Sequence, residues 1–257
     1  MLDDLYAGAL ADADARREMR PFGHVEAAAL DRSPALDALS ALRPADRVKI
    51  IAEVKRASPS RGDLSVIADP ASLAVSYATG GASAISVLTE GRRFKGTLAD
   101  LEAVRDVVDV PVLRKDFIAD PYQVFEARAA GADLVLLIVA GLPQARLVEL
   151  HELVRSLGMT ALIEAHSADE VRRGLDAGAE VLGVNARDLS TFELDRDLFG
   201  RLADAIPSGV VRVAESAVSS PADVAHYRRS GADVVLVGEA LVTHGDPIDA
   251  LTSFLEV

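Results

Sequence analysis

The sequence predicts an α/β protein, a (β/α)8 TIM barrel with an N-terminal helical extension, and three observations support this. A phrase of Gly, Ala and a short β-rich apolar run occurs four times. Four further apolar runs lie between these phrases, and each of the eight runs precedes a helix-length segment. Strands that alternate with crossover helices form a parallel sheet covered by helices, and eight such units fit a closed barrel. The glycines of the phrase recur about every 50 residues: Gly81, Gly131, Gly178 and Gly231.

The elements can be placed in chain order. Helical patterns near residues 2–20 and 34–42 predict an extension over 1–47, packed on a barrel of 48–257 in a single domain. We expect strands in 48–55, 80–90, 110–117, 130–141, 159–165, 177–188, 209–216 and 230–240. Helices are clearest in 70–80, 97–108, 121–131, 143–158 and 221–231, and each repeat glycine is expected to end a helix in the left-handed conformation. A doubly wound sheet explains neither the fourfold repeat nor the absence of a GxGxxG turn.

Composition excludes several classes of function. The 257 residues carry 27 Lys+Arg and 40 Asp+Glu, a formal charge of −13, which argues against binding to nucleic acid or anionic membranes. Without cysteine there is no disulfide, thiolate nucleophile or Cys zinc site, and the five histidines lack metal-site spacing. The acidic N-terminus is unlike a signal peptide, and no apolar run reaches the roughly 18 residues of a membrane span, so we expect a cytoplasmic protein without a metal.

Polar residues at the carboxyl ends of the predicted strands indicate the active site. Catalytic groups of such barrels cluster at this end, and residues two apart in a strand face the same side. A single such residue could be a solvated charge, but burying the whole set is costly unless it is functional. The set is Glu53 and Lys55 in the first strand, Lys115 in the third, Glu164 in the fifth, Asn185 and Arg187 in the sixth, and Glu215 and Ser216 in the seventh.

Loops and side chains around these strand ends give further expectations. The segments ESAVSS and VGEALV after the seventh and eighth strands could bind a phosphate through backbone N–H groups. The loop after the first strand has about 15 residues, and Pro59 and Gly62 suggest either a hinged lid or a surface loop. His166 either lines the site or lies in a surface loop. The arginines near the N-terminus are expected on a solvated helix face: Arg16, Arg17 and Arg20.

An ordered series of motifs is similar to the indole-3-glycerol phosphate synthase family of tryptophan biosynthesis. The motifs run from about residue 49 to the end: IIAEVKRASPSRG, SVLTEGRRFKGTLADL, PVLRKDFIADPYQVFEARAAGAD, LIEAH, GVNARDL, AES and VLVGEAL. The resemblance implies a lyase that converts 1-(2-carboxyphenylamino)-1-deoxyribulose 5-phosphate to indole-3-glycerol phosphate, CO2 and water. General acid and base groups suffice for this ring closure, so no cofactor is expected. The implied partners are the phosphorylated substrate and, loosely, other enzymes of the pathway.

The resemblance also implies roles for the site residues. Lys115 would be the general acid and Glu164 the general base, while Lys55, with Glu53, would stabilise negative charge and share the acid work. Asn185, Arg187 and Ser58 would hold the substrate carboxylate and hydroxyl groups, and Glu215 and Ser216 would complete the polar wall. The aromatic ring would pack among Phe94, Phe117, Leu136, Ile138 and Leu189. The phosphate would be bound by Lys55, Ser216, Ala217, Gly238 and Glu239.

Two positions depart from the family pattern. Ala217 stands where the family usually has Gly, and Glu239 stands where Ser or Thr is common. We expect a negative φ at Ala217, so that alanine fits without strain and the Ala217→Gly variant binds substrate equally well or slightly less well. A phosphoribosyl-sugar isomerase and a non-catalytic phosphate-binding barrel are the alternatives. The two lysines speak against the first, and the full charged set speaks against the second.

Overall fold

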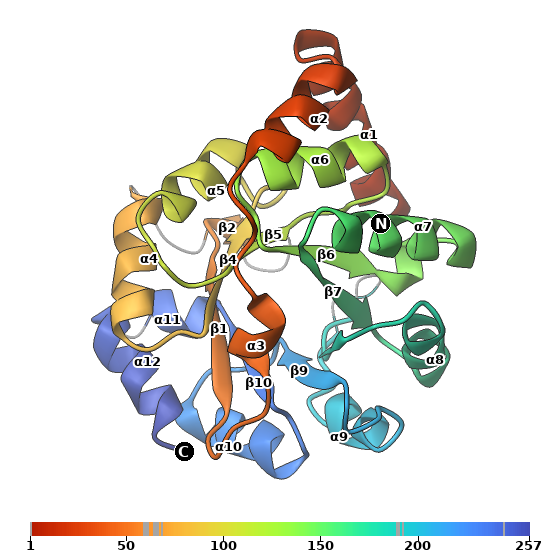
Figure 1. Cartoon of the computed structure of the whole chain (residues 1–257). Coiled ribbons are helices and arrows are strands. Elements are labelled where there is room, and N and C mark those ends of the chain that lie inside the picture. The colour runs from red at the N-terminus through yellow and green to blue at the C-terminus, as the bar shows by residue number, and fades with distance from the viewer. Residues whose placement is uncertain are drawn as a thin grey trace.

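The computed structural model shows the fold of the chain at the level of individual side chains for most residues. It describes residues 2–58, 62, 63, 67, 69–188, 191, 193–243 and 245–257, with the side chains of 58, 62, 63 and 243 left out. Within these residues, eight parallel strands close a barrel in which each strand pairs with the next along the chain, and the last pairs with the first (Figure 1). The strands are β1 (Lys49–Val54), β4 (Ala84–Leu88), β5 (Val112–Lys115), β6 (Leu134–Ile138), β7 (Thr160–Ala165), β8 (Val181–Asn185), β9 (Val211–Glu215) and β10 (Val234–Val237).

Helices surround the barrel and confirm the predicted (β/α)8 architecture (Figure 1). The outer helices are α4 (Pro70–Thr79), α5 (Leu98–Arg105), α6 (Pro121–Ala129), α7 (Gln144–Ser156), α8 (Ala168–Asp176), α9 (Leu198–Ala203), α10 (Pro221–Arg229) and α12 (Pro247–Leu255). The short η1 (Val139–Gly141) follows β6, and α11 (Glu239–Thr243) follows β10. All four repeat glycines have the expected positive φ: Gly81 99°, Gly131 94°, Gly178 90° and Gly231 94°.

The strands are buried on both faces because helices cover them outside and apolar side chains fill the barrel inside. Burial in β4, β6 and β8 is complete along the whole strand. One contiguous apolar core therefore includes both the barrel interior and the layer between strands and helices. This rigid ring fixes the eight strand ends from which the site is built.

The N-terminal extension contains α1 (Leu2–Met19), α2 (Phe22–Asp31) and α3 (Ala38–Leu42). The sequence patterns predicted the first and third, but α2 was missed because its apolar residues pack on a neighbouring helix instead of the barrel core. Val25 and Ala29 of α2 form a separate small cluster with Ala13, Tyr122 and Phe125. Figure 1 shows α1 and α2 beside α6, away from the barrel axis. On the other side, α3 contacts the start of β1, where Lys49 Nζ donates to the Ala41 carbonyl at 2.6 Å.

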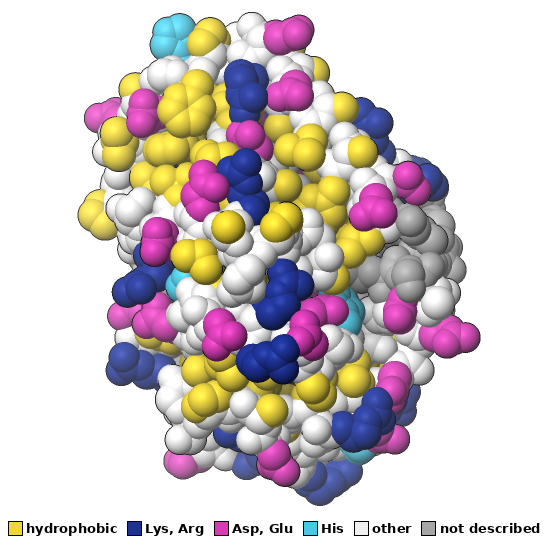
Figure 2. Space-filling model, turned by 90° about the vertical axis from the view of Figure 1, so that its right-hand side faces the viewer, with side chains coloured by type: hydrophobic (Ala, Val, Ile, Leu, Met, Phe, Trp, Pro, Cys, Tyr) yellow, Lys and Arg dark blue, Asp and Glu magenta, His cyan; other side chains and the backbone are white. Residues whose placement is uncertain are grey.

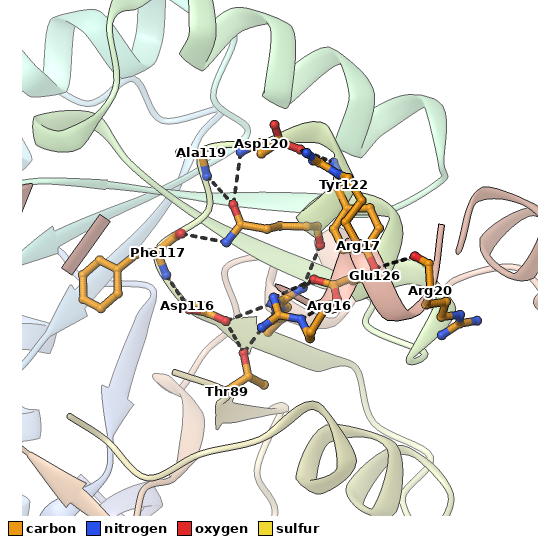
Figure 3. A network of polar contacts seen from close by, with 12 residues as sticks. Arg16, Arg17, Arg20, Thr89, Asp116, Phe117, Ala119, Asp120, Tyr122 and Glu126 are labelled. Atoms are coloured by element: carbon orange, nitrogen blue, oxygen red, sulfur yellow. Dashed lines mark hydrogen bonds and ion pairs between the residues drawn. The ribbon is translucent and has the colours of Figure 1, made fainter. Parts of the chain in front are cut away.

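Charged side chains join α1 to α6, which corrects the prediction that Arg16 and Arg17 lie on a solvated face (Figure 3). Arg16 binds the buried Glu126 carboxylate in a two-pronged pair of 2.6 and 2.8 Å. Arg17 pairs with Asp120, and its guanidinium lies 4.9 Å from the centre of the Tyr122 ring. These arginines are held by α6 because carboxylates of its first turns face them. Arg20, by contrast, is exposed as predicted.

The surface bears charges of both signs. On the face shown in Figure 2, Lys and Arg lie among Asp and Glu, while hydrophobic side chains gather toward one end. In the part of the chain that the structure describes, no helix is long and apolar enough to cross a membrane.

Candidate active site

A cavity of about 310 Å³ opens at the carboxyl ends of the barrel strands. Most of the predicted site residues line it: Glu53, Lys55, Phe94, Lys115, Phe117, Leu136, Ile138, Glu164, Asn185, Arg187, Glu215, Ser216, Ala217, Gly238 and Glu239. Two predictions remain open, because the Ser58 side chain and the whole of Leu189 lie outside the described residues. The lid expected over 57–66 is described only as the antiparallel pair β2 (Ala57–Ser58) and β3 (Gly62–Asp63), with 59–61 and 64–66 outside the description.

Lys115 occupies the centre of the charged cluster. It is the last residue of β5, and its Nζ lies 2.7 Å from Glu215 Oε2 and 3.3 Å from Glu164 Oε2. Both carboxylate side chains are almost fully buried, at 1% and 2% exposure. Burial alone would lower the pKa of Lys115, but the carboxylates of Glu215, Glu164 and Glu53 raise it well above its ordinary value. Lys115 is therefore held as a cation between two carboxylates.

The two carboxylates beside Lys115 have opposite pKa shifts. Burial raises the pKa of Glu215, and the attraction of Lys115 offsets this only in part. For Glu164, the attraction of Lys115 and the contacts with His166 and Asn185 outweigh burial and lower the pKa. Opposite shifts in neighbouring titratable groups are typical of sites that divide acid and base work between them.

A glycine that the sequence analysis did not select makes room for this cluster. Gly183 lies in β8, in register with Glu164 of β7 and close to Glu215 of β9. A Cβ on Gly183 would stand 2.1 Å from Glu215 Oε1. The strand glycine thus provides the space in which the Glu215 carboxylate reaches Lys115, a requirement that only side-chain packing reveals.

Lys55 and Glu53 form a second ion pair at the end of β1, with Nζ 2.7 Å from Oε2. Glu53 is buried at 3% exposure, whereas Lys55 is partly open at 20%. Gly238, predicted to offer its N–H to phosphate, also leaves space for this pair, because a Cβ there would lie 2.7 Å from Glu53 Oε2. Lys55 therefore places a positive charge at the cavity, while the carboxylate of Glu53 remains buried.

The polar wall continues through β8 and β9. Ser216 Oγ donates to Asn185 Oδ1 at 2.7 Å, and the Arg187 N–H donates to the same oxygen at 3.0 Å. The Asn185 amide oxygen is thus occupied by protein donors, which fixes the orientation of its side chain. Arg196, which the sequence analysis missed, also lines the cavity and pairs with Asp223 at 2.8 Å.

Aromatic side chains form the opposite wall. The Phe94 and Phe117 rings lie 6.3 Å apart, and Phe117 meets Tyr6 of α1 edge to face at 5.6 Å. Tyr6 fits beside η1 only because of Gly141, where a Cβ would come within 1.9 Å of the Tyr6 ring. The N-terminal extension therefore supports the apolar wall through Tyr6. No sequence motif predicted this contact.

Two buried carboxylates hold the loops that carry these phenylalanines. Glu90 accepts the Phe94 N–H at 2.9 Å. Asp116 accepts the Phe117 N–H at 2.8 Å and is itself held by Thr89 Oγ1 at 2.6 Å and Arg114 Nη2 at 2.9 Å, as Figure 3 shows for the labelled residues. The rings are thus positioned by local hydrogen bonds, and Asp116, which the sequence did not single out, itself lines the cavity.

The turn after β9 corrects one prediction. Ser216 has a φ of 69° and Ala217 a φ of 55°, so both lie in the left-handed region. The negative φ expected at Ala217 was wrong, because two successive residues must bend the chain sharply for Ser216 to reach Asn185 and then enter the loop before α10. An alanine in this region carries strain of about 1 kcal/mol relative to glycine.

His166 follows β7 and touches the cluster from outside the cavity. Its Nε2 lies 3.3 Å from Glu164 Oε1 and its Nδ1 lies 3.2 Å from Glu170 Oε2. The side chain is 12% exposed and lies in the loop between β7 and α8 without lining the cavity. Among the described residues, no group of three or more His, Asp or Glu side chains is arranged to hold a metal ion.

A (β/α)8 barrel with partly buried lysines in contact with buried carboxylates at its strand ends is typical of enzymes that use general acid and base groups. The family model for indole-3-glycerol phosphate synthase matches residues 2–254, and the chain belongs to this family. As a member, it is a carboxy-lyase of tryptophan biosynthesis that acts on a phosphorylated small molecule. This decides against the isomerase and the non-catalytic alternatives.

Individual relatives agree with the family match. The indole-3-glycerol phosphate synthase of Leifsonia xyli subsp. xyli is 71% identical over 254 residues, covering 99% of this chain and 97% of the relative. That of Beutenbergia cavernae is 57% identical over 255 residues, covering 99% and 94%. Among solved structures, a 3-hexulose-6-phosphate synthase matches with a TM-score of 0.64 and 17% identity, over 81% of this chain and 99% of that one. A thiamine phosphate pyrophosphorylase from Pyrococcus furiosus has a TM-score of 0.63 and 15% identity, over 86% and 96%, and such likenesses show the fold alone.

Proposed function

We propose that Lys115 is the general acid and Glu164 the general base of the ring closure. The observation that carries the proposal is the position of Lys115 Nζ, 3.3 Å from Glu164 and 2.7 Å from Glu215, inside the cavity. Lys115 would protonate the substrate C2 carbonyl oxygen while the aromatic carbon bearing the carboxylate forms the new C–C bond. Loss of CO2 then restores the benzene ring, and its bonding electrons return to the ring system.

Dehydration follows in the same cavity. Glu164 would take a proton from the carbon next to the nitrogen while the hydroxyl group leaves as water, protonated by Lys55. The arrangement couples the two steps, because a Lys115 that has given up its proton no longer lowers the pKa of Glu164. Glu164 then becomes a stronger base when it is needed, and the proton that it takes can pass to Lys115 at 3.3 Å.

Substrate binding would divide between three parts of the cavity. The Phe94 and Phe117 rings offer an apolar face for the anthranilate ring, with Leu136 and Ile138 beneath. Arg187 and the Asn185 amide would hold the carboxylate and hydroxyl groups. The phosphate would bind at the far side through Lys55, the side chain of Ser216 and the backbone N–H groups of Ala217, Gly238 and Glu239.

The test is turnover of 1-(2-carboxyphenylamino)-1-deoxyribulose 5-phosphate, followed by indole fluorescence. Lys115→Ala and Glu164→Gln should each lower kcat by about 10²–10⁴, with substrate binding within about tenfold for Lys115→Ala. Glu180→Gln is the control, since Glu180 precedes β8 at the opposite end of the barrel. A near wild-type kcat in either site variant would overturn that residue's role.

Two broader expectations belong to the same proposal. A diffusible phosphorylated substrate suits a cytoplasmic enzyme, and consecutive pathway steps suit loose association with other tryptophan-pathway enzymes. Cell fractionation tests the location. Co-purification at low salt from the native host, compared with purification at high salt, tests the association, which should be lost as salt rises if charge contacts carry it.

A further inference from the structure

His166 occupies an unusual place beside the proposed base. It stands directly after β7 and two residues beyond Glu164, yet its side chain does not line the cavity. Its Nε2 lies 3.3 Å from Glu164 Oε1, the oxygen that Lys115 does not contact. Both atoms are buried, and among the described residues neither makes a hydrogen bond, so the 3.3 Å between them is an ion-pair distance. Two unsatisfied polar atoms thus face each other, and a small rotation of either side chain would join them.

Glu170 holds the other side of the His166 ring. Its Oε2 lies 3.2 Å from Nδ1 and accepts the His166 backbone N–H at 2.9 Å. Glu170 sits in the first turn of α8, where its own N–H donates to Ser167 Oγ at 3.2 Å. The start of this helix thus fixes Glu170, and Glu170 fixes the plane of the imidazole.

The charges around His166 favour its protonated form. The groups that face it are Glu164 on β7 and Glu170 on α8, while Lys115 from β5 and Glu215 from β9 lie beyond Glu164. Burial alone would lower the pKa of His166, but the two carboxylates raise it to about 10. An imidazolium with both ring nitrogens protonated can contact both carboxylates at once.

We propose that His166 is a positioning residue that holds Oε1 of Glu164 through its Nε2, with Glu170 as the residue that orients the imidazole. Oε2 of Glu164 is then left toward Lys115 and the substrate, as a base must be. The positive charge also compensates a cluster in which Glu53, Glu164 and Glu215 outnumber Lys55 and Lys115. This inference rests on the proposed role of Glu164 as the base.

The experiment compares three variants in steady-state turnover across pH. His166→Asn places its amide near the position of Nδ1 and loses the contact with Glu164, so kcat should fall about ten- to a hundredfold with KM little changed, the range for loss of one hydrogen bond to a charged group. His166→Gln places an N–H near the position of Nε2 and should recover part of kcat. Glu170→Gln should cause a smaller loss than His166→Asn.

The pH profile separates positioning from a merely structural role. Without the imidazolium, the pKa of Glu164 rises, so the acidic limb of kcat should move to higher pH in both His166 variants, including the partly active His166→Gln. His151→Asn is the matched control, because His151 is a buried histidine on α7 that does not line the cavity. Its acidic limb should match the wild type.

Two outcomes would overturn the inference: a His166→Asn variant with wild-type kcat, or a loss of kcat with no displacement of the acidic limb and no recovery in His166→Gln. Circular dichroism and thermal unfolding show whether each variant is folded. If His166→Asn does not fold, Glu170→Gln still tests whether the orientation of the imidazole affects kcat. Failure of the underlying proposal looks different, because then Glu164→Gln itself would retain wild-type turnover.

Discussion

Replacing Lys115 by methionine tests how the charged cluster is held together. Lys115 contacts two carboxylates at 2.7 and 3.3 Å, and their side chains are 1% and 2% exposed. Methionine keeps much of the stem volume but removes the charge, so Glu164 and Glu215 become buried carboxylates without this cation. Breaking one buried pair in this way costs about 3–5 kcal/mol. We expect a loss of this size in the free energy of unfolding at pH 8.

The loss of stability should be largest at high pH and shrink as the pH falls. In the wild type, the lowered pKa of Glu164 contributes stability above the ordinary pKa of a glutamate, and this contribution is lost as pH falls. In Lys115→Met, the pKa of Glu215, already raised in the wild type, rises further, and the pKa of Glu164 rises because only His166 and Asn185 still lower it, so the folded variant gains more protons and more stability than the wild type as pH falls. Each pH unit relieves up to about 1.4 kcal/mol per group. The difference between the two proteins should therefore shrink strongly between pH 8 and pH 5.

The assay is equilibrium urea unfolding of both proteins at pH 8 and pH 5. Lys49→Met serves as the control, since Lys49 is a half-buried barrel lysine whose Nζ donates to the Ala41 carbonyl and has no carboxylate partner in the described residues. Its stability difference from the wild type should vary little with pH. A Lys115→Met loss below about 1 kcal/mol at pH 8, or one that is equal at both pH values, would refute the reasoning.

Three further outcomes follow from the geometry. Ala217→Gly relieves positive-φ strain but adds chain entropy when unfolded, so product should bind equally well or up to about fivefold more tightly by titration, and weaker binding would contradict the observed φ. Gly183→Ala should lower kcat at least tenfold while the chain stays folded, because its Cβ displaces the Glu215 carboxylate; unchanged turnover would show that the strand yields instead. Arg16→Ala leaves the buried Glu126 with one cation fewer and should lower the free energy of unfolding by about 1–3 kcal/mol in a single urea transition. Two transitions would contradict the prediction that residues 1–257 form one domain.

Much of the fold and the site is determined by local patterns in the sequence. Glycine is the residue that adopts the left-handed conformation at low cost. The four repeat glycines therefore predict helix ends without any information on tertiary contacts. The alternation of strand residues places Lys115, Glu164 and Glu215 on the inner face. In any strand, residues two positions apart point to the same side, and this does not depend on the rest of the chain. Parallel strands then brought these carboxyl ends to one rim.

Other features depend on contacts between segments far apart in the chain, and only the tertiary structure decided them. The space beside Gly183 matters because Glu215 from another strand enters it, and Tyr6 reaches the site wall because Gly141 leaves room for its ring. Gly183 begins the GVNARDL motif and Gly141 ends the run 130–141, but neither pattern indicates which distant side chain needs the space. The positive φ of Ala217 was also hidden, since alanine is found in nearly every local structure and its backbone was set by the turn that brings Ser216 to Asn185. Periodicity reports which way a side chain points, whereas the distance between two side chains is fixed by the packing of the whole barrel.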